Sequence, residues 1–275
     1  MSETPMNTPA DTDLWLPLDG LAPGFDAFRA PHSSALEGRA FTCVMAGGAV
    51  TVANSFDGGR LTWTVNGPEG ELTSSTNYEA FDVADDLIYV QVKSEHRDDE
   101  AIALFIDFAA GTGLSVITVI GPEGQTPVRV TQRFMPFVIE GHATPGPMPT
   151  RTNALVGYRA WWRYSEVHAY EHVYLSEHWY TWHCLAGPEK TLADTDEQTT
   201  YEVRPGFYVF AWREKVIPCA AVTIADHRDP ANLRSHGALF GLDESGTSPV
   251  MFTFGAHGKK LAKAEYPSDL DPALW

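Results

Sequence analysis

The chain has 275 residues, of which 44% are apolar, 12% aromatic and 20% charged, and its formal net charge is −17. This length is ample for two domains or one large all-β domain, and the apolar fraction excludes general disorder. The negative charge argues against nucleic acid or an anionic membrane as the main partner, because like charges repel.

The cysteine pattern and the N-terminal sequence bear on the compartment. Cys43, Cys184 and Cys219 are widely spaced and odd in number, so no disulfide framework is expected. The sequence shows no basic-then-apolar N-terminal signal and no apolar run approaching 18 residues. We therefore expect a cytoplasmic protein without membrane contact.

A period-two alternation of apolar and polar residues dominates the chain after a polar stretch at 1–14, which is expected to be a loose tail. Clusters of Gly, Pro, Asn and Asp interrupt the alternation, as is typical of short strands joined by turns. Two short stretches, 23–28 and 74–80, resemble helix. In the first half, strands are predicted at Thr42–Asn54 (a pair), Leu61–Val65, Leu87–Lys93, Ile102–Phe108, Ser115–Val119 and Val128–Phe134.

The second half of the chain repeats the first at an offset of 119 or 120 residues. Thr62-Trp63 recurs as Thr181-Trp182, and Gly67-Pro68-Glu69 recurs as Gly187-Pro188-Glu189. A fixed period indicates duplicated architecture. Each copy has the length of a small antiparallel barrel, whose mouth normally holds one small ligand.

The duplication predicts a tandem domain organisation. We expect an N-terminal barrel at 15–134 and a C-terminal barrel at 154–265, followed by a tail at 266–275. The stretch 135–153 contains four prolines and two glycines, so it is predicted to be a linker.

One segment resembles a known family. Tyr180–Lys190 (YTWHCLAGPEK) and Leu192–Asp196 (LADTD) resemble the C-terminal signature of the MoaF family. The upstream half is similar to the N-terminal domain of that family, and the resemblance spans roughly residues 15–265. The family is named for molybdenum cofactor biosynthesis. The resemblance implies two tandem lipocalin-like, or calycin-like, β-barrels, and it supplies no catalytic residues.

The two predicted barrels differ in side-chain chemistry. One face of the strand at 167–175 carries four rings with polar tips, whereas the offset places four small residues at the matching positions 49–55. Rings of this kind suit a pocket for a planar molecule, so the C-terminal barrel is predicted to hold the ligand. Two alternatives stay open: the rings fill their barrel or line a contact between barrels or subunits, or the small residues leave room for a ligand in the N-terminal barrel.

The candidate residues follow from acid–base chemistry. A Tyr or His transfers the proton, an Arg grips an acidic group, and a carboxylate such as Glu171 or Glu214 becomes more basic through burial. No HExxH or CxxC pattern supports a metal, so neither metal nor cofactor is expected. The predicted catalytic residues are His172, Tyr174 and Tyr170, and the predicted ligand-binding residues are Trp161, Arg163, His168, Tyr180, Trp182, Tyr208 and Trp212.

The functional expectation is a MoaF-like small-molecule-binding barrel. As an enzyme it would act without a cofactor on a small aromatic or heteroaromatic ligand, as a decarboxylase, lyase, isomerase or cyclase. The alternative is a non-catalytic carrier of a pterin-type intermediate, which the family name implies. The expected partner is a small-molecule ligand rather than nucleic acid or membrane, and a homodimer is left open.

Overall fold

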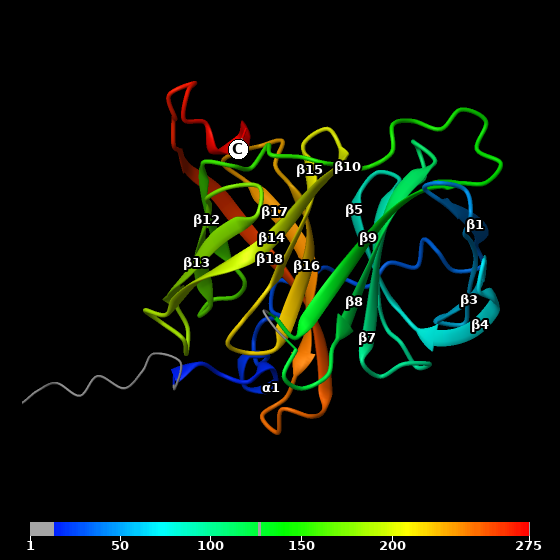
Figure 1. The fold of residues 1–275 in the computed structure, drawn as a ribbon, viewed down its shortest axis with the longest axis horizontal. Coiled ribbons are helices and arrows are strands. Elements are labelled where there is room, and N and C mark those ends of the chain that lie inside the picture. The colour runs from blue at the N-terminus through cyan, green and yellow to red at the C-terminus, as the bar shows by residue number, and fades with distance from the viewer. Residues whose placement is uncertain (1–13, 126–127, 275) are drawn as a thin grey trace, which may run out of the picture.

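A computed structural model describes residues 14–125 and 128–274 and shows two β units side by side (Figure 1). The N-terminal unit is one antiparallel sheet in the order β4-β3-β2-β1-β9-β8-β7-β6-β5. Its terminal strands β4 and β5 do not pair, so the curled sheet stays open as a half-barrel. The strands are β1 (Ala40–Met45), β2 (Thr51–Asp57), β3 (Arg60–Gly67), β4 (Gly70–Asn77), β5 (Glu79–Ala84), β6 (Leu87–Lys93), β7 (Glu100–Asp107), β8 (Thr112–Ile120) and β9 (Val130–Ile139).

The C-terminal unit is a closed barrel of eight strands, β11 to β18. The ring closes because β14 pairs with both β13 and β15, while the short β10 extends one edge of β14. A 3-10 turn, Pro272–Leu274, lies near the C-terminus. The strands are β10 (Thr150–Arg151), β11 (Tyr158–Arg163), β12 (Ala169–Tyr174), β13 (Trp179–Ala186), β14 (Ala193–Arg204), β15 (Phe207–Arg213), β16 (Cys219–Asp226), β17 (Leu233–Leu242) and β18 (Pro249–Lys263).

The two units share one strand plan, which confirms the prediction of tandem antiparallel barrels from a duplication. Strands β1, β2 and β3 correspond in order to β11, β12 and β13, and β9 closes on β1 as β18 closes on β11. The copies differ at one place: the single 12-residue strand β14 stands where the N-terminal unit has the separate strands β4 and β5. That break opens the N-terminal sheet.

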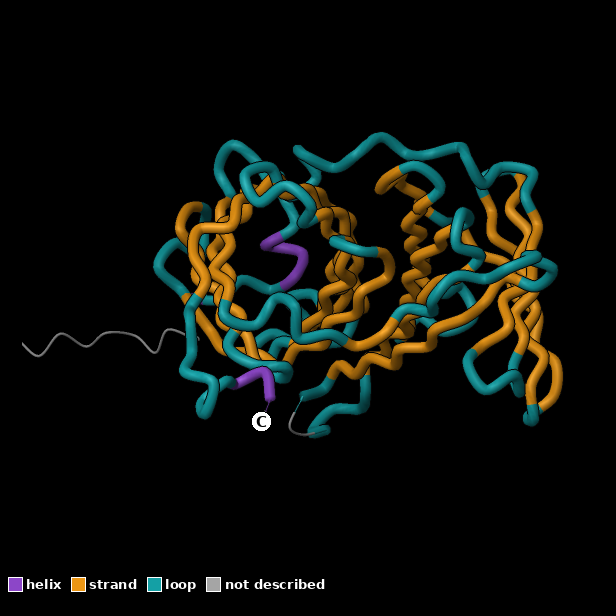
Figure 2. The backbone as a smooth tube through the Cα atoms, turned by 90° about the horizontal axis from the view of Figure 1, so that it is seen from above, coloured by secondary structure: helices purple, strands orange, loops and turns teal. Residues whose placement is uncertain are grey.

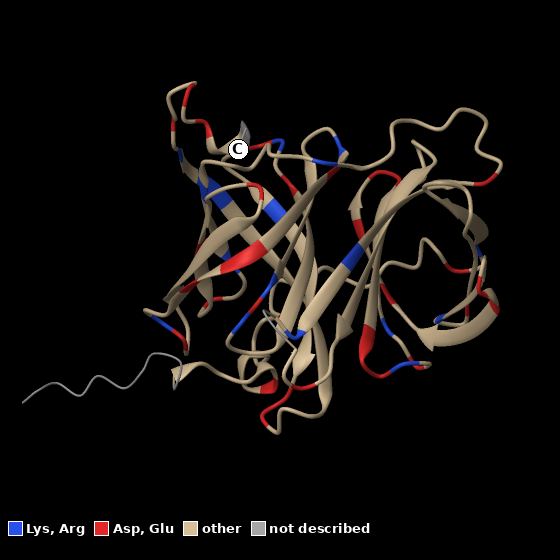
Figure 3. Ribbon diagram, in the orientation of Figure 1, with Lys and Arg blue, Asp and Glu red and all other residues tan. Residues whose placement is uncertain are grey.

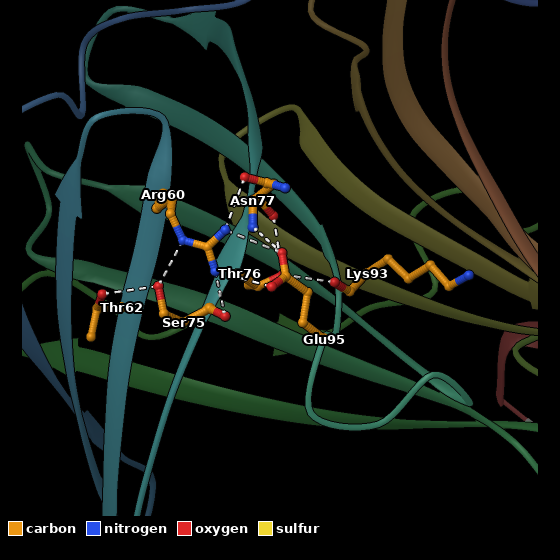
Figure 4. Close-up of polar contacts among 7 residues, drawn as sticks. All are labelled: Arg60, Thr62, Ser75, Thr76, Asn77, Lys93 and Glu95. Atoms are coloured by element: carbon orange, nitrogen blue, oxygen red, sulfur yellow. Dashed lines mark hydrogen bonds and ion pairs between the residues drawn. The ribbon is translucent and has the colours of Figure 1, made fainter.

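Side chains, rather than backbone pairing, span the break (Figure 4). The Arg60 guanidinium on β3 donates to the Ser75 hydroxyl at 3.1 Å and to Glu95 at 3.0 Å, and the Asn77 N–H donates to Glu95 at 3.1 Å. Glu95 follows β6, so the network ties β4 to the far side of the gap. The half-barrel thus keeps its curvature without a continuous ladder.

Two helix predictions and one linker boundary are wrong. The helix α1 is Leu18–Leu21, whereas 23–28 forms turns and 74–80 lies in β4 and β5. The strand β9 runs through Pro136 to Ile139, five residues into the predicted linker. Pro136 is tolerated because the ladder between β9 and β1 begins only at Phe137.

The outer faces of the two units pack together through an apolar cluster. Strand β16 is almost continuously buried because one face lines the barrel and the other contacts the N-terminal unit. At the edge of this contact, the buried Asp107 accepts two hydrogen bonds from Arg204, at 2.8 and 2.7 Å. The apolar contact comprises, from one unit, Phe81, Leu87, Tyr89, Ala103, Phe105, Leu114 and Val116 and, from the other, Val203, Phe207, Val209, Ala211, Val222 and Ile224.

The N-terminal plug, residues 14–28, packs into the mouth of the C-terminal barrel. Figure 2 shows α1 within the ring of strands. Leu18 is 1% exposed and Phe25 is 3% exposed, and both belong to the apolar core of that barrel. The sequence predicts that 15–28 belong to the N-terminal barrel. The structure places these residues in the other one, because their apolar side chains fill its open end.

Charged side chains are distributed over both units (Figure 3). The predicted tail at 1–14 lies almost wholly outside the described residues. No helix in the described part of the chain is long and apolar enough to span a lipid bilayer.

Candidate functional site

The lumen of the C-terminal barrel is lined by alternate residues of its strands. On β12, Tyr170, His172 and Tyr174 are buried and point inward, and on β13 Tyr180 and Trp182 do the same. The cross-strand register pairs His172 with Trp182 and Tyr174 with Tyr180. This register brings the rings of the two strands into one aromatic cluster.

The rings fill most of the lumen and leave a cavity of about 40 Å³ beneath the N-terminal plug. One water molecule needs roughly 10–15 Å³ of such space, so the cavity has room for a few waters. Ligand pockets are usually about 300–1,000 Å³, so a larger ligand requires the plug to move. The lining residues are Leu21, Phe25, Tyr164, Tyr170, His172, Tyr180, Trp182, Glu189, Trp212, Glu214, Leu239 and Phe254.

His172 is the central polar group of the cavity. Its ring lies 5.3 Å from that of Tyr180 and 5.7 Å from that of Trp212, and the residue is 5% exposed. Burial lowers the pKa of His172 to about 3, so the imidazole is neutral at physiological pH. Its Nδ1 atom is buried without a hydrogen-bond partner in the structure.

Tyr180 presents a second unpartnered group. Its side chain is fully buried, its hydroxyl has no hydrogen-bond partner, and burial raises its pKa well above the ordinary value. Nearby, the indole N–H of Trp162 is also buried and unpartnered. Because buried polar groups are nearly always hydrogen-bonded in folded proteins, the two groups on cavity-lining residues, His172 Nδ1 and the Tyr180 hydroxyl, are candidate contacts for a polar guest, whereas Trp162 does not line the cavity.

Two carboxyl groups lie against the indoles of the lumen. Glu214 accepts a hydrogen bond from Trp212 Nε1 at 3.0 Å, and Asp196 accepts one from Trp182 Nε1 at 3.0 Å. Burial and the neighbouring Asp196 charge raise the pKa of Glu214 to about 8. Burial likewise raises the pKa of Asp196 to about 6, opposed by Lys215, whose ammonium lies 3.3 Å away.

The repeated Gly-Pro-Glu turn supplies a third carboxyl group. Glu189 accepts hydrogen bonds from the Tyr170 hydroxyl and from the Leu16 N–H, each at 3.1 Å, so it joins the barrel rim to the plug. Gly187 is required here: its φ is +125°, and a Cβ would lie 2.9 Å from His168 Cδ2. Burial raises the pKa of Glu189 above its ordinary value.

Five of the ten predicted site residues line the cavity: Tyr170, His172, Tyr180, Trp182 and Trp212. His168 lies at the mouth, where its ring is 4.5 Å from that of Phe25 and its Nδ1 lies 3.0 Å from the Ser165 hydroxyl. Tyr174 is buried further along β12, against Phe210, and does not line the cavity.

The structure places the other predicted residues away from the cavity. Trp161 and Arg163 alternate with the inward-facing Trp162 and lie on the outer face, where Arg163 pairs with Glu166. Tyr208 lies toward the other end of the barrel, with its ring 5.4 Å from that of His227.

Within the described residues, no arginine lines the cavity, so the expected arginine grip on an acidic group is not formed there. Arg159 pairs with Glu171 at 2.7 Å outside the barrel, so Glu171 is not a lumen carboxylate either. Arg213 points into the contact between the units, where it donates to Gln132 at 3.0 Å. The candidate arginines alternate with the inward-facing residues of their strands, which directs them outward.

Several lining residues are not among the ten predicted site residues. Strand parity would have found Tyr164, because it shares a face with Trp162, and likewise Phe254 on β18. The contributions of Leu21 and Phe25 carried no such signal, because a distant segment of the chain supplies them. Glu189 lies in the repeated Gly-Pro-Glu turn, whose sequence indicates no particular chemistry.

A larger hollow of about 540 Å³ lies outside the barrel, between the plug, β5 and β18. Its Arg29 donates to Glu79 and to the Thr253 hydroxyl, each at 3.0 Å. Thr253 donates in turn to Glu79 at 2.8 Å. Because these polar groups are paired with one another, the lumen is the better candidate site.

Comparison with known proteins identifies the family of this chain. Residues 13–122 match the MoaF N-terminal domain, and residues 149–264 match the MoaF C-terminal domain. Protein MoaF from Klebsiella aerogenes is 30% identical over 265 residues, which cover 90% of this chain and 95% of that protein. The chain belongs to the MoaF family. The MoaF C-terminal match spans every strand of the closed barrel, and the MoaF N-terminal match takes in the plug.

A solved structure from Burkholderia vietnamiensis that carries a provisional β-lactamase name also matches. It is 20% identical, covers 40% of this chain and 96% of its own, and has a TM-score of 0.31. Within the described residues, no group of three His, Cys, Asp or Glu side chains is arranged to hold a metal ion.

The partly buried Glu214 predicts a pH-dependent stability. In the folded chain its pKa is about 8 instead of 4.5, so the folded state keeps a proton that the unfolded state loses above about pH 4.5. Stability from this group is therefore complete below pH 4.5 and is lost as pH rises toward 8. Glu214→Gln should gain stability relative to the wild type between pH 5 and pH 8, measured by urea unfolding at both values. The exposed Glu166→Gln is the control, and equal slopes for both variants would contradict the assignment.

Proposed function

We propose that the C-terminal barrel binds a small aromatic or heteroaromatic molecule in its lumen and transfers a proton to or from it without a cofactor. The observation that carries this proposal is the pair of unpartnered buried atoms, His172 Nδ1 and the Tyr180 hydroxyl, on one ring-lined cavity. Leaving such atoms unpaired costs roughly 1–3 kcal/mol each, so a guest with a polar edge is favoured.

The residues suit different roles. A group transfers protons best when its pKa lies near the working pH, and Glu214, at about 8, meets that condition. His172 stays neutral and serves as a hydrogen-bond partner that orients the guest. Tyr170, whose hydroxyl donates to Glu189 at 3.1 Å, offers its hydroxyl oxygen as a further acceptor at the mouth. The reaction class that fits is a lyase or isomerase step.

Binding can be tested with benzyl alcohol, a neutral ring with one hydroxyl, by calorimetry and crystal soaking. We expect one molecule per chain in the lumen, and about tenfold weaker binding for Tyr180→Phe, because one hydrogen bond within a buried site is lost. Tyr266→Phe, at an exposed tyrosine, should bind as the wild type does. Equal affinity for both variants would mean that the Tyr180 hydroxyl meets only water.

A second measurement distinguishes an enzyme from a non-catalytic carrier. Native mass spectrometry of the purified chain would identify a co-purifying molecule, which is then incubated with the protein in deuterium oxide. If the protein transfers a proton, the released molecule should contain deuterium, and Glu214→Gln should abolish this incorporation of deuterium. A guest that stays bound and takes up no deuterium indicates a carrier.

A further inference from the structure

The charge of the cavity lining is one-sided. Glu189 and Glu214 are its carboxyl side chains, and no Lys or Arg contributes to it within the described residues. Asp196 stands behind the wall, bonded to the lining Trp182. Lys215 contacts Asp194 and Asp196 from a partly exposed position and does not line the cavity. A guest with a negative group would therefore meet like charge.

The aromatic walls of the cavity also favour a positively charged guest. The faces of Trp and Tyr rings carry negative electrostatic potential and attract cations, more strongly when water is excluded. Trp182 lies 5.2 Å from Trp15 of the plug, ring to ring, and Phe25 lies 5.1 Å from Tyr164, so the plug completes the enclosure. A cation in this cavity would be surrounded by ring faces and carboxylates.

Two buried groups point independently to a guest. Neutral His172 offers Nδ1, and Tyr180 offers its hydroxyl oxygen, and neither atom has a partner. Both residues are more than nine-tenths buried and line the cavity. An ammonium group has three N–H donors and no acceptor, so it can satisfy a carboxylate and these acceptors together.

We infer that the guest of the C-terminal barrel is a small aromatic amine whose protonated nitrogen is held by Glu214 and Glu189 among the rings. This inference rests on the proposed function and specifies the class of its ligand. Glu214 is neutral in the empty barrel, so it gives up its proton as the ammonium binds. The proton passes to solvent, and the carboxylate forms a charge-assisted hydrogen bond with the ligand.

The test compares three probes that share one ring: benzylamine, benzyl alcohol and benzoate. Calorimetry is run on the full chain and on Phe25→Ala, which widens the mouth. We expect benzylamine to bind about tenfold tighter than benzyl alcohol, and benzoate to bind weakest. Glu214→Gln should abolish the preference for the amine, so that benzylamine binds no tighter than benzyl alcohol to this variant. Glu166→Gln, at a side chain 78% exposed, removes the same charge from the outer surface and should preserve the preference.

The outcomes separate the two proposals. Binding of benzyl alcohol as tight as that of benzylamine, or tighter binding of benzoate, overturns the amine inference and leaves the lumen as a binding site. A preference for the amine that survives in Glu214→Gln also overturns the assignment to this carboxylate. If none of the three binds even in Phe25→Ala, the proposed function itself fails.

Discussion

Phe25→Ala should destabilise the folded chain by about 3 kcal/mol and open the lumen. Phe25 is buried among the rings of Tyr164, His168, Tyr170 and Phe254, and truncating a buried Phe usually costs about 3–5 kcal/mol. The lower value applies because the plug can shift to fill part of the space. Urea unfolding followed by tryptophan fluorescence measures the loss.

Phe28→Ala is the matched control three residues along the plug. Phe28 is partly exposed and contacts His257 and Arg163 at the outer surface, so its loss should cost about 1 kcal/mol or less. Phe25→Ala should also expose the plug to limited proteolysis, whereas Phe28→Ala should not. Equal stability of the two variants would show that the plug contributes little to the barrel.

Asp107→Ala should have a comparably large effect at the contact between the two units. The Asp107 carboxylate is buried and accepts hydrogen bonds from Arg204 and from the Ala110 N–H. Removing one partner of a buried pair costs about 3–5 kcal/mol, because the other charge is left without compensation. Arg204 is partly exposed, so about 3 kcal/mol is expected from thermal or urea unfolding.

A double-mutant cycle with Arg204→Ala isolates the pair. The combined variant should lose less stability than the two single losses added together, with a coupling of about 1–3 kcal/mol. Arg97→Ala, at an exposed pair with Asp99, should change stability by no more than about 1 kcal/mol. Strict additivity of Asp107→Ala and Arg204→Ala would contradict a direct interaction between the units at this pair.

The strand pattern made the fold predictable, and the same reasoning recovered half of the site. The alternation around His172 and the fixed offset depend on local sequence and strand geometry, so they indicated a tandem barrel and a ring-lined face. Five predicted residues line the cavity. The errors at Trp161 and Arg163 arose because residue type was weighed above strand parity, which directs both side chains outward.

The remaining features depend on contacts between distant segments. No local pattern shows that Phe25 enters a barrel whose strands begin more than 130 residues later. Glu189 acquires its place from a turn that brings it over the mouth, next to Leu16. Whether a barrel is closed or open depends on one strand. In the N-terminal unit this strand is interrupted at Tyr78, whereas in the C-terminal unit the matching strand β14 continues. Strand propensity alone does not predict this difference.

The unbroken β14 has a consequence for how the two halves can meet other molecules. A ring in which every strand has two neighbours offers no backbone edge, apart from the short extension at β10. The N-terminal sheet has free edges at β4 and β5, where N–H and C=O groups lack strand partners. The closed barrel therefore recognises other molecules through the side chains that it encloses. Among the described residues, a strand from another chain would instead pair at the gap between β4 and β5 of the half-barrel.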